Sequence, residues 1–176
     1  EDVDSSLIDL TDRIVDGVLY WDIPEGHWRI FVLYETYDAK GVNNLHVNHL
    51  VRESVKLLID NVYQKHYDRY AEEFGKTIAG FFSDEPAFYN FPGTYEASIG
   101  RKQMLLPWRR GLLEEMEMDY GKKLLAFLPG LWFDIGEMTP YIRYVYMEKV
   151  SKLYAENFAG QIGDWCRKHN VEYIGH

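Results

Sequence analysis

The stretch GFFSDEPAFYN at residues 80–90 indicates the class of fold, because it combines a short apolar run with two adjacent carboxylates at the end of that run. The run itself, TIAGFFS at 77–83, begins on a β-branched pair and suits a strand buried on both faces better than a helix of that length. Asp84 and Glu85 follow directly, and Pro86 ends the run. Parallel α/β folds bind their ligands at the carboxyl ends of their strands. The pattern therefore predicts that both carboxylates lie at a functional edge.

The two carboxylates should have different roles, because neighbouring side chains on an extended strand point to opposite sides. We expect Glu85 to be the functional acid, since its longer side chain can reach into a cleft. Aromatic neighbours such as Phe82, Phe88 and Tyr89 would raise its pKa by desolvation. Asp84 would then orient Glu85 or contact a substrate. The alternative is a structural pair of rim carboxylates that form ion pairs with Lys or Arg.

The flanking sequence predicts further strands and helices. Aromatic and β-branched residues at 18–37 predict a hairpin around the turn IPEGH, with a long second strand at 28–36. Apolar residues at helical spacing predict a helix over 51–74, with Asn48 as its N-cap and Gly75 as its stop. The later elements are helices at 108–119, 122–127 and 141–169 and a strand at 171–175.

This order of elements predicts an α/β fold of parallel β-strands with crossover helices, preceded by a β-hairpin. It fits either an open doubly wound sheet or part of a (β/α)8 (TIM) barrel. We expect residues 1–176 to form a single domain, with a hairpin region at 1–27 and strand–helix units at 28–176. A complete barrel needs about 250 residues, and the chain begins on Glu1 and ends just after a predicted strand. We therefore expect it to be a fragment of a larger catalytic barrel.

Composition narrows the classes of partner. The sequence has 19 Lys and Arg against 28 Asp and Glu, a net charge of −9 that disfavours nucleic acid and anionic membrane surfaces and favours a neutral ligand. No apolar run approaches the roughly 20 residues of a membrane span. The single Cys166 excludes an internal disulfide and leaves the compartment open. No phosphate-binding glycine loop or nucleophile elbow is present, which argues against nucleotide-dependent transfer and serine hydrolysis.

Histidine and tyrosine residues supply further candidates. His46 and His49 are three residues apart, a spacing that metals use, but two histidines alone do not define a metal site, and we assign none. His176 follows the last predicted strand and would open onto the same edge as Glu85 if the two strands are neighbours. Tyr34 and Tyr89 are candidate platforms for stacking a sugar ring.

Two other groups favour structural interpretations. Trp108, Trp132 and Trp165 fall at or beside helical apolar positions, so we interpret them as packing residues. The acidic run at 114–119 lies on a predicted helix and is interpreted as a solvated face.

Three segments resemble the barrel glycoside hydrolases, particularly the large bacterial α-L-rhamnosidase-like and β-galactosidase-like sugar hydrolases. They are GVLYWDIPEGHWRIFVLYET at 17–36, FGKTIAGFFSDEPAF at 74–88 and VEYIGH at 171–176. In these barrels the fourth strand commonly ends in Asn-Glu, whose Glu is the general acid. The resemblance places that role on Glu85, with Asp84 in place of the Asn. It also implies that these segments contain strands three, four and five, and that a second catalytic carboxylate lies beyond His176.

Glycoside cleavage needs one protonated carboxyl group and a second, ionised one. We therefore expect a carbohydrate-active hydrolase without a cofactor, with Glu85 and Asp84 as catalytic residues and Tyr34, Tyr89 and His176 as substrate-binding residues. The chain alone is expected to be inactive, because an oligomeric partner or the missing remainder of the barrel must complete the sheet. Two alternatives stay open. One is a noncatalytic carbohydrate-binding or assembly module, and the other is a metal-dependent hydrolase that uses His46, His49, Asp84 and His176.

Overall fold

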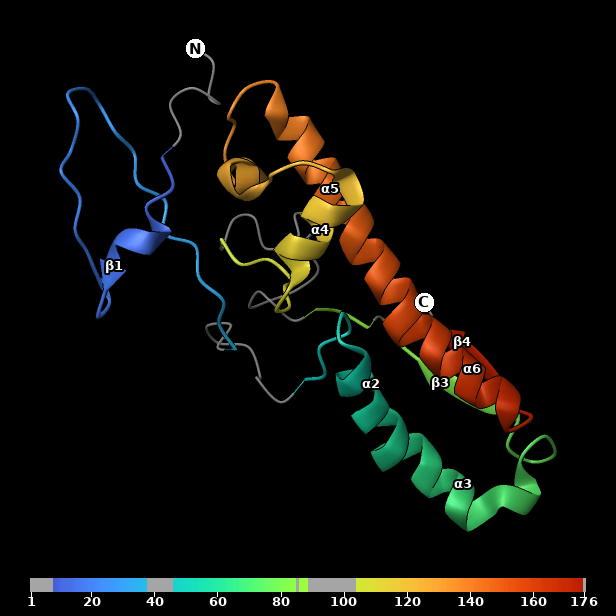
Figure 1. Cartoon of the computed structure of the whole chain (residues 1–176). Helices are drawn as coiled ribbons and strands as arrows, with labels where there is room; N and C mark the ends of the chain where they lie inside the picture. The colour runs from blue at the N-terminus through green and yellow to red at the C-terminus, as the bar shows by residue number, and fades with distance from the viewer. Residues whose placement is uncertain (1–7, 38–45, 85, 89–103, 176) are drawn as a thin grey trace.

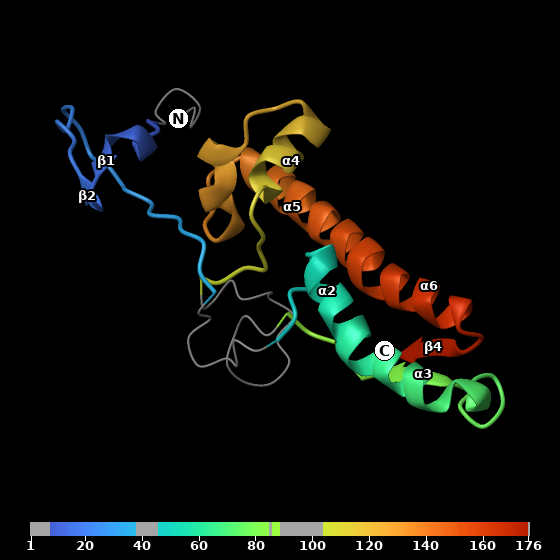
Figure 2. The same ribbon diagram turned by 60° about the horizontal axis from the view of Figure 1, so that its bottom comes forward.

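The computed structural model describes residues 8–37, 46–84, 86–88 and 104–175 (Figure 1). An N-terminal arm lies to one side of two long helical rods, and a pair of short strands runs alongside the rods (Figures 1 and 2). Among the described residues, no helix combines the length and apolarity needed to cross a bilayer.

The arm contains a hairpin that is shorter and earlier than predicted. A 3-10 turn, η1 (Thr11–Arg13), leads into strands β1 (Ile14–Val15) and β2 (Val18–Leu19), which pair antiparallel. The two turn residues, Asp16 and Gly17, both have positive φ, at 51° and 77°. This is the backbone of a type I′ turn, which Asp-Gly favours and which matches the twist of the flanking strands.

The long strand predicted at 28–36 is wrong. Residues 20–37 form no strand, and their side chains are largely exposed, including Tyr34 at 75%. Trp28 instead folds back locally, where its indole N–H donates to the Pro24 carbonyl at 2.9 Å and its ring packs edge-on against Trp21. A strand needs a partner for its backbone groups, and within the described ranges no residue forms a ladder with this segment.

The helix predicted at 51–74 is confirmed as the first rod. It consists of α2 (Arg52–Leu58), a π-helical segment η2 (Ile59–Tyr63), α3 (Gln64–Tyr70) and a 3-10 turn η3 (Ala71–Glu73). Gly75 follows at a φ of 74°, a conformation that suits glycine. The N-cap is Val51 rather than Asn48. Asn48 forms an earlier Asx turn, in which its side-chain oxygen accepts from the Leu50 N–H at 3.0 Å.

The second rod confirms the long helix predicted at 141–169 and starts three residues earlier. It consists of α5 (Met138–Tyr154), a π-helical segment η5 (Ala155–Gly160) and α6 (Gln161–Lys168). Before it come α4 (Leu112–Tyr120), which starts four residues later and ends one residue later than the helix predicted at 108–119, and a 3-10 segment η4 (Leu125–Leu131), which overlaps the short helix predicted at 122–127.

The strands predicted at 77–83 and 171–175 are present and are neighbours. β3 (Gly80–Ser83) and β4 (Glu172–Gly175) pair parallel, with Gly80 opposite Glu172 and Ser83 opposite Gly175. Burial of β3 on both faces is not observed in the described chain. Phe81 packs on the helices, whereas Phe82 and Ile174, opposite each other in register, are each 60% exposed.

Two hydrophobic clusters stabilise the described chain. One joins α4 and η4 to α5, and its fully buried residues include Leu112, Met116 and Ile142. The other joins the first rod to η5, α6 and the strand pair. Trp165 lies in the second cluster, while Trp108 and Trp132 pack against the first, which confirms all three as packing residues. The predicted barrel and single domain stay predictions.

Candidate functional site

The carboxyl ends of β3 and β4 meet at one edge, because Ser83 is opposite Gly175. Asp84 follows β3 at this edge and is exposed. Glu85 and His176 are expected to open onto the same edge if the strands that precede them are neighbours, and β3 and β4 are neighbours. Glu85, Tyr89 and His176 themselves lie outside the described residues.

Tyr63 of η2 contacts Phe81 and Ser83 of β3. Its ring is buried and lies 4.6 Å from the ring of Phe81. Burial raises the pKa of the Tyr63 hydroxyl, and a hydrogen bond with the Ser83 side chain partly opposes that rise. The last residue of β3 is therefore held by a neutral hydroxyl group.

An aromatic cluster holds the segment that follows the two carboxylates. The Tyr154 hydroxyl lies 3.4 Å from the Pro86 carbonyl, to which it donates, and the Phe88 ring lies 5.6 Å from the Tyr154 ring. His49 completes the cluster, with ring centroids 5.8 Å from Phe88, 5.6 Å from Tyr154 and 4.4 Å from Phe158. Residues from the second rod and from the segment before α2 thus fix the chain just after the acidic pair.

His49 is a neutral buried residue. It is 4% exposed, and its Nδ1 atom has no hydrogen-bond partner in the described part of the chain. Burial, helped by the charge of His46, lowers the pKa of His49 to about 4. Within the described ranges no three His, Cys, Asp or Glu side chains are grouped as metal ligands would be. The metal-dependent alternative therefore gains no support from His49, whose neighbours are aromatic rings.

A pocket of about 560 Å³ lies on the other side of the chain segment that carries His49. Asn48 and Leu50, the two residues that flank His49, both line it. The other walls come from residues 35–37 of the arm, 51–53 at the start of α2, 108–110, and two residues of the second rod, Leu153 and Asn157. No local pattern in the sequence predicts this pocket, because its walls come from four separate segments. Tyr34 is next to the lining in sequence, but no described contact joins it to the β3–β4 edge.

Trp108 forms a fixed wall of this pocket. Its indole N–H donates to Glu35 Oε1 at 2.9 Å, and its carbonyl accepts from Asn48 Nδ2 at 2.9 Å. Its ring stacks on Tyr146 with an interplanar angle of 12°, and the Tyr146 hydroxyl donates to the Pro107 carbonyl at 2.6 Å. Trp108 therefore packs, as predicted, and also presents an aromatic surface to a cavity.

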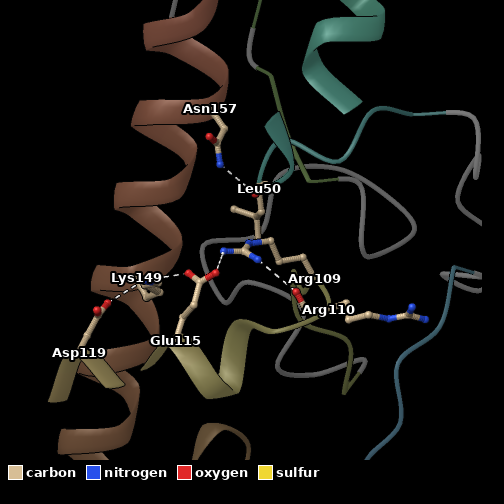
Figure 3. A network of polar contacts seen from close by, with 7 residues as sticks. All are labelled: Leu50, Arg109, Arg110, Glu115, Asp119, Lys149 and Asn157. Atoms are coloured by element: carbon tan, nitrogen blue, oxygen red, sulfur yellow. Dashed lines mark hydrogen bonds and ion pairs between the residues drawn. The ribbon is translucent and has the colours of Figure 1, made fainter. Parts of the chain in front are cut away.

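A charged network includes Arg109, which also lines the pocket (Figure 3). Arg109 Nη2 binds Glu115 Oε1 at 2.5 Å, and Lys149 Nζ binds Glu115 Oε2 at 3.1 Å and Asp119 Oδ2 at 2.6 Å. Hydrogen bonds from Arg109 and Lys149 lower the carboxyl pKa values of Glu115 and Asp119 respectively. The interpretation of residues 114–119 as a solvated face holds for Asp119, which is exposed, and is wrong for Glu115, which is half-buried and shares with Asp119 a partner, Lys149, that is only 9% exposed.

Comparison with known proteins identifies a distant relative. The chain is 24% identical over 178 residues to a protein of Formosa agariphila named "Putative beta-glucuronidase". The similarity covers 95% of this chain but 14% of that protein, so the chain spans about a seventh of the relative's length. This similarity suggests a region like that of a glycoside hydrolase. No family model and no solved structure matches the chain.

Proposed function

We propose that this chain is part of the catalytic barrel of a glycoside hydrolase, with Glu85 as general acid and Asp84 as its orienting or sugar-binding neighbour. One observation carries the proposal: the parallel strands β3 and β4 end at the same edge, and the acidic pair begins there. In parallel α/β folds this is the edge at which ligands bind. The distant relative's name supports the same class of enzyme.

The uncovered face of the strand pair supports the barrel part of the proposal. Phe82 and Ile174 are apolar, side by side in register and 60% exposed. Parallel sheets are ordinarily covered on both faces, and large apolar side chains fill the interior of a (β/α)8 barrel. Further strands that curl over this face would bury both residues. The aromatic cluster of His49, Tyr154 and Phe88 would lie outside that interior and hold the loop after Glu85.

The proposed chemistry needs two carboxyl groups. Glu85 would be protonated before cleavage and would donate its proton to the oxygen of the leaving group. A second, ionised carboxylate would attack the anomeric carbon or activate a water molecule. We place that residue on a later strand, beyond residue 176, and expect the chain alone to be inactive. The relative's name makes a β-glucuronide the first substrate to test.

The test is a Glu85→Gln substitution in the intact protein, assayed on two substrates. With a poor leaving group such as a simple alkyl glycoside, turnover should fall by about 10² to 10⁴, the usual contribution of a general acid. With a dinitrophenyl glycoside, whose leaving group needs no proton, the loss should be much smaller. Glu72→Gln, at an exposed carboxylate of η3, is the matched control and should retain wild-type turnover. Equal turnover of Glu85→Gln and wild type on the alkyl glycoside would refute the assignment.

The pocket beside Trp108 favours one alternative, a noncatalytic carbohydrate-binding module. In that case the intact protein would bind a sugar, no glycoside would be cleaved, and Glu85→Gln would change neither result. The same pair of measurements, binding and turnover, therefore separates the two functions.

A further inference from the structure

The pocket beside Trp108 is close to the proposed catalytic edge but separate from it. His49 lies between them: its ring contacts Phe88, three residues after Glu85, while its sequence neighbours Asn48 and Leu50 line the pocket. A ligand in this pocket would therefore lie beside the acidic pair rather than on it. Its volume of about 560 Å³ is ordinary for a site that takes a small molecule.

The walls of the pocket are formed before any ligand binds. The Trp108 side chain is held by Glu35 and by its stack on Tyr146. The Leu50 carbonyl accepts from Asn157 Nδ2 at 3.0 Å, which ties the segment before α2 to the second rod. Because these groups are already ordered, a ligand would not have to order them, and this favours affinity.

Some of the charged side chains that line the pocket form ion pairs and others do not. Of the three lining arginines, Arg109 is bound to Glu115, and its neighbour Arg110 points away from that network (Figure 3). In the part of the chain that the structure describes, the guanidinium groups of Arg110 and Arg52 form no ion pair, and the Glu53 carboxylate forms none either. Glu35, the other lining carboxylate, also forms no ion pair among the described residues and accepts from the Trp108 indole N–H, so the guanidinium groups of Arg52 and Arg110 keep their donors for an anionic group of a ligand.

We infer that this pocket binds an acidic saccharide, with Arg52 and Arg110 on the sugar carboxylate and Trp108 beside the ring. Arginine binds a carboxylate through two parallel hydrogen bonds, and a sugar ring offers an apolar face to an aromatic side chain. Glu53 supplies an acceptor for hydroxyl groups. The inference rests on the proposed function for the class of ligand, and it adds a second, non-reacting sugar position next to the catalytic edge.

The experiment measures binding separately from turnover. Methyl β-D-glucuronide and methyl β-D-glucoside, which differ only in the carboxylate, are titrated into the intact protein by calorimetry. The glucuronide should bind at least about tenfold more tightly, since a hydrogen bond to a charged group contributes about 1.5–3 kcal/mol and 1.4 kcal/mol is tenfold. The preference should decrease as salt is raised, because the arginines are exposed.

Substitutions then assign the binding to the pocket. Arg52→Gln and Arg110→Gln should each remove about tenfold of the glucuronide preference and leave glucoside binding unchanged. Arg13→Gln, at an exposed arginine of η1, is the matched control and should have no effect. Glu85→Gln should leave this binding intact while it lowers turnover of an alkyl glycoside by about 10² to 10⁴, which separates the inference from the proposed function. Equal affinity for the two glycosides, or a preference that both pocket arginine variants retain, would overturn the inference even if Glu85 proves catalytic.

Discussion

Burial of His49 makes the stability of the protein depend on pH in a range where most carboxylates are already ionised. The folded pKa is about 4, against 6.5 for an ordinary histidine. Between these values the unfolded chain takes up a proton that the folded chain refuses, so stability is fully present above pH 6.5 and is lost as the pH falls toward 4. The full loss is about 3 kcal/mol, of which about 2 kcal/mol falls between pH 7 and pH 5.

The assay is urea unfolding of wild type and His49→Phe at pH 7 and at pH 5. Phenylalanine keeps an aromatic ring in the cluster and removes the titrating group. Wild type should therefore lose about 2 kcal/mol more than the variant over this range. His27→Phe, at an exposed histidine, is the control and should keep the wild-type dependence. Comparison of pH dependences cancels any direct effect of a substitution on packing. The reasoning would be refuted if His49→Phe and wild type lost the same free energy between the two pH values.

Three further substitutions test the packing that positions the site. Gly80→Ala would place a Cβ atom 2.5 Å from a carbonyl oxygen of β4, so we expect the free energy of unfolding in urea to fall by at least about 2 kcal/mol. Gly163→Ala is the control and should be nearly neutral, because its Cβ atom meets only a flexible guanidinium group at 3.3 Å. Lys149→Met leaves Asp119 unpaired and Glu115 paired with Arg109 alone, and should cost about 1–2 kcal/mol, less in high salt; a salt-independent cost would contradict the network. Tyr146→Phe removes a buried hydrogen bond and should cost about 1–2 kcal/mol by the same assay, whereas unchanged stability would show that the bond contributes nothing.

Local patterns predicted the elements whose stability depends on their own sequence. Apolar residues at helical spacing located both rods, and the runs TIAGFFS and VEYIG located β3 and β4. The segment 28–36 has an equally strong β-rich composition, but a strand also requires a partner, and a single segment carries no information about its partner. The observed hairpin does have a local signal, namely Asp16-Gly17 between apolar residues.

The candidate site depends on contacts between distant residues, and these were harder to predict. The spacing of His46 and His49 suggests metal ligands, yet the aromatic neighbours of His49 come from two segments far along the chain, Phe88 from one and Tyr154 and Phe158 from the second rod. The partial burial of Glu115 is not apparent from the acidic run, because its partner Lys149 lies on another helix. The sequence predicts the strand edge and its carboxylates, whereas the pocket is apparent only in the folded chain.

Tyr154 packs against both hydrophobic clusters, at the point where α5 passes into η5. The continuous rod from Met138 to Lys168 therefore contributes to both clusters, and loss of either cluster would expose apolar surface of the rod that the other cluster packs against. We expect the two halves to melt together in one cooperative transition. Because the Tyr154 hydroxyl also donates to the Pro86 carbonyl, a ligand that binds at the carboxyl edge of β3 and β4 would raise the melting temperature of the whole described chain rather than of one half.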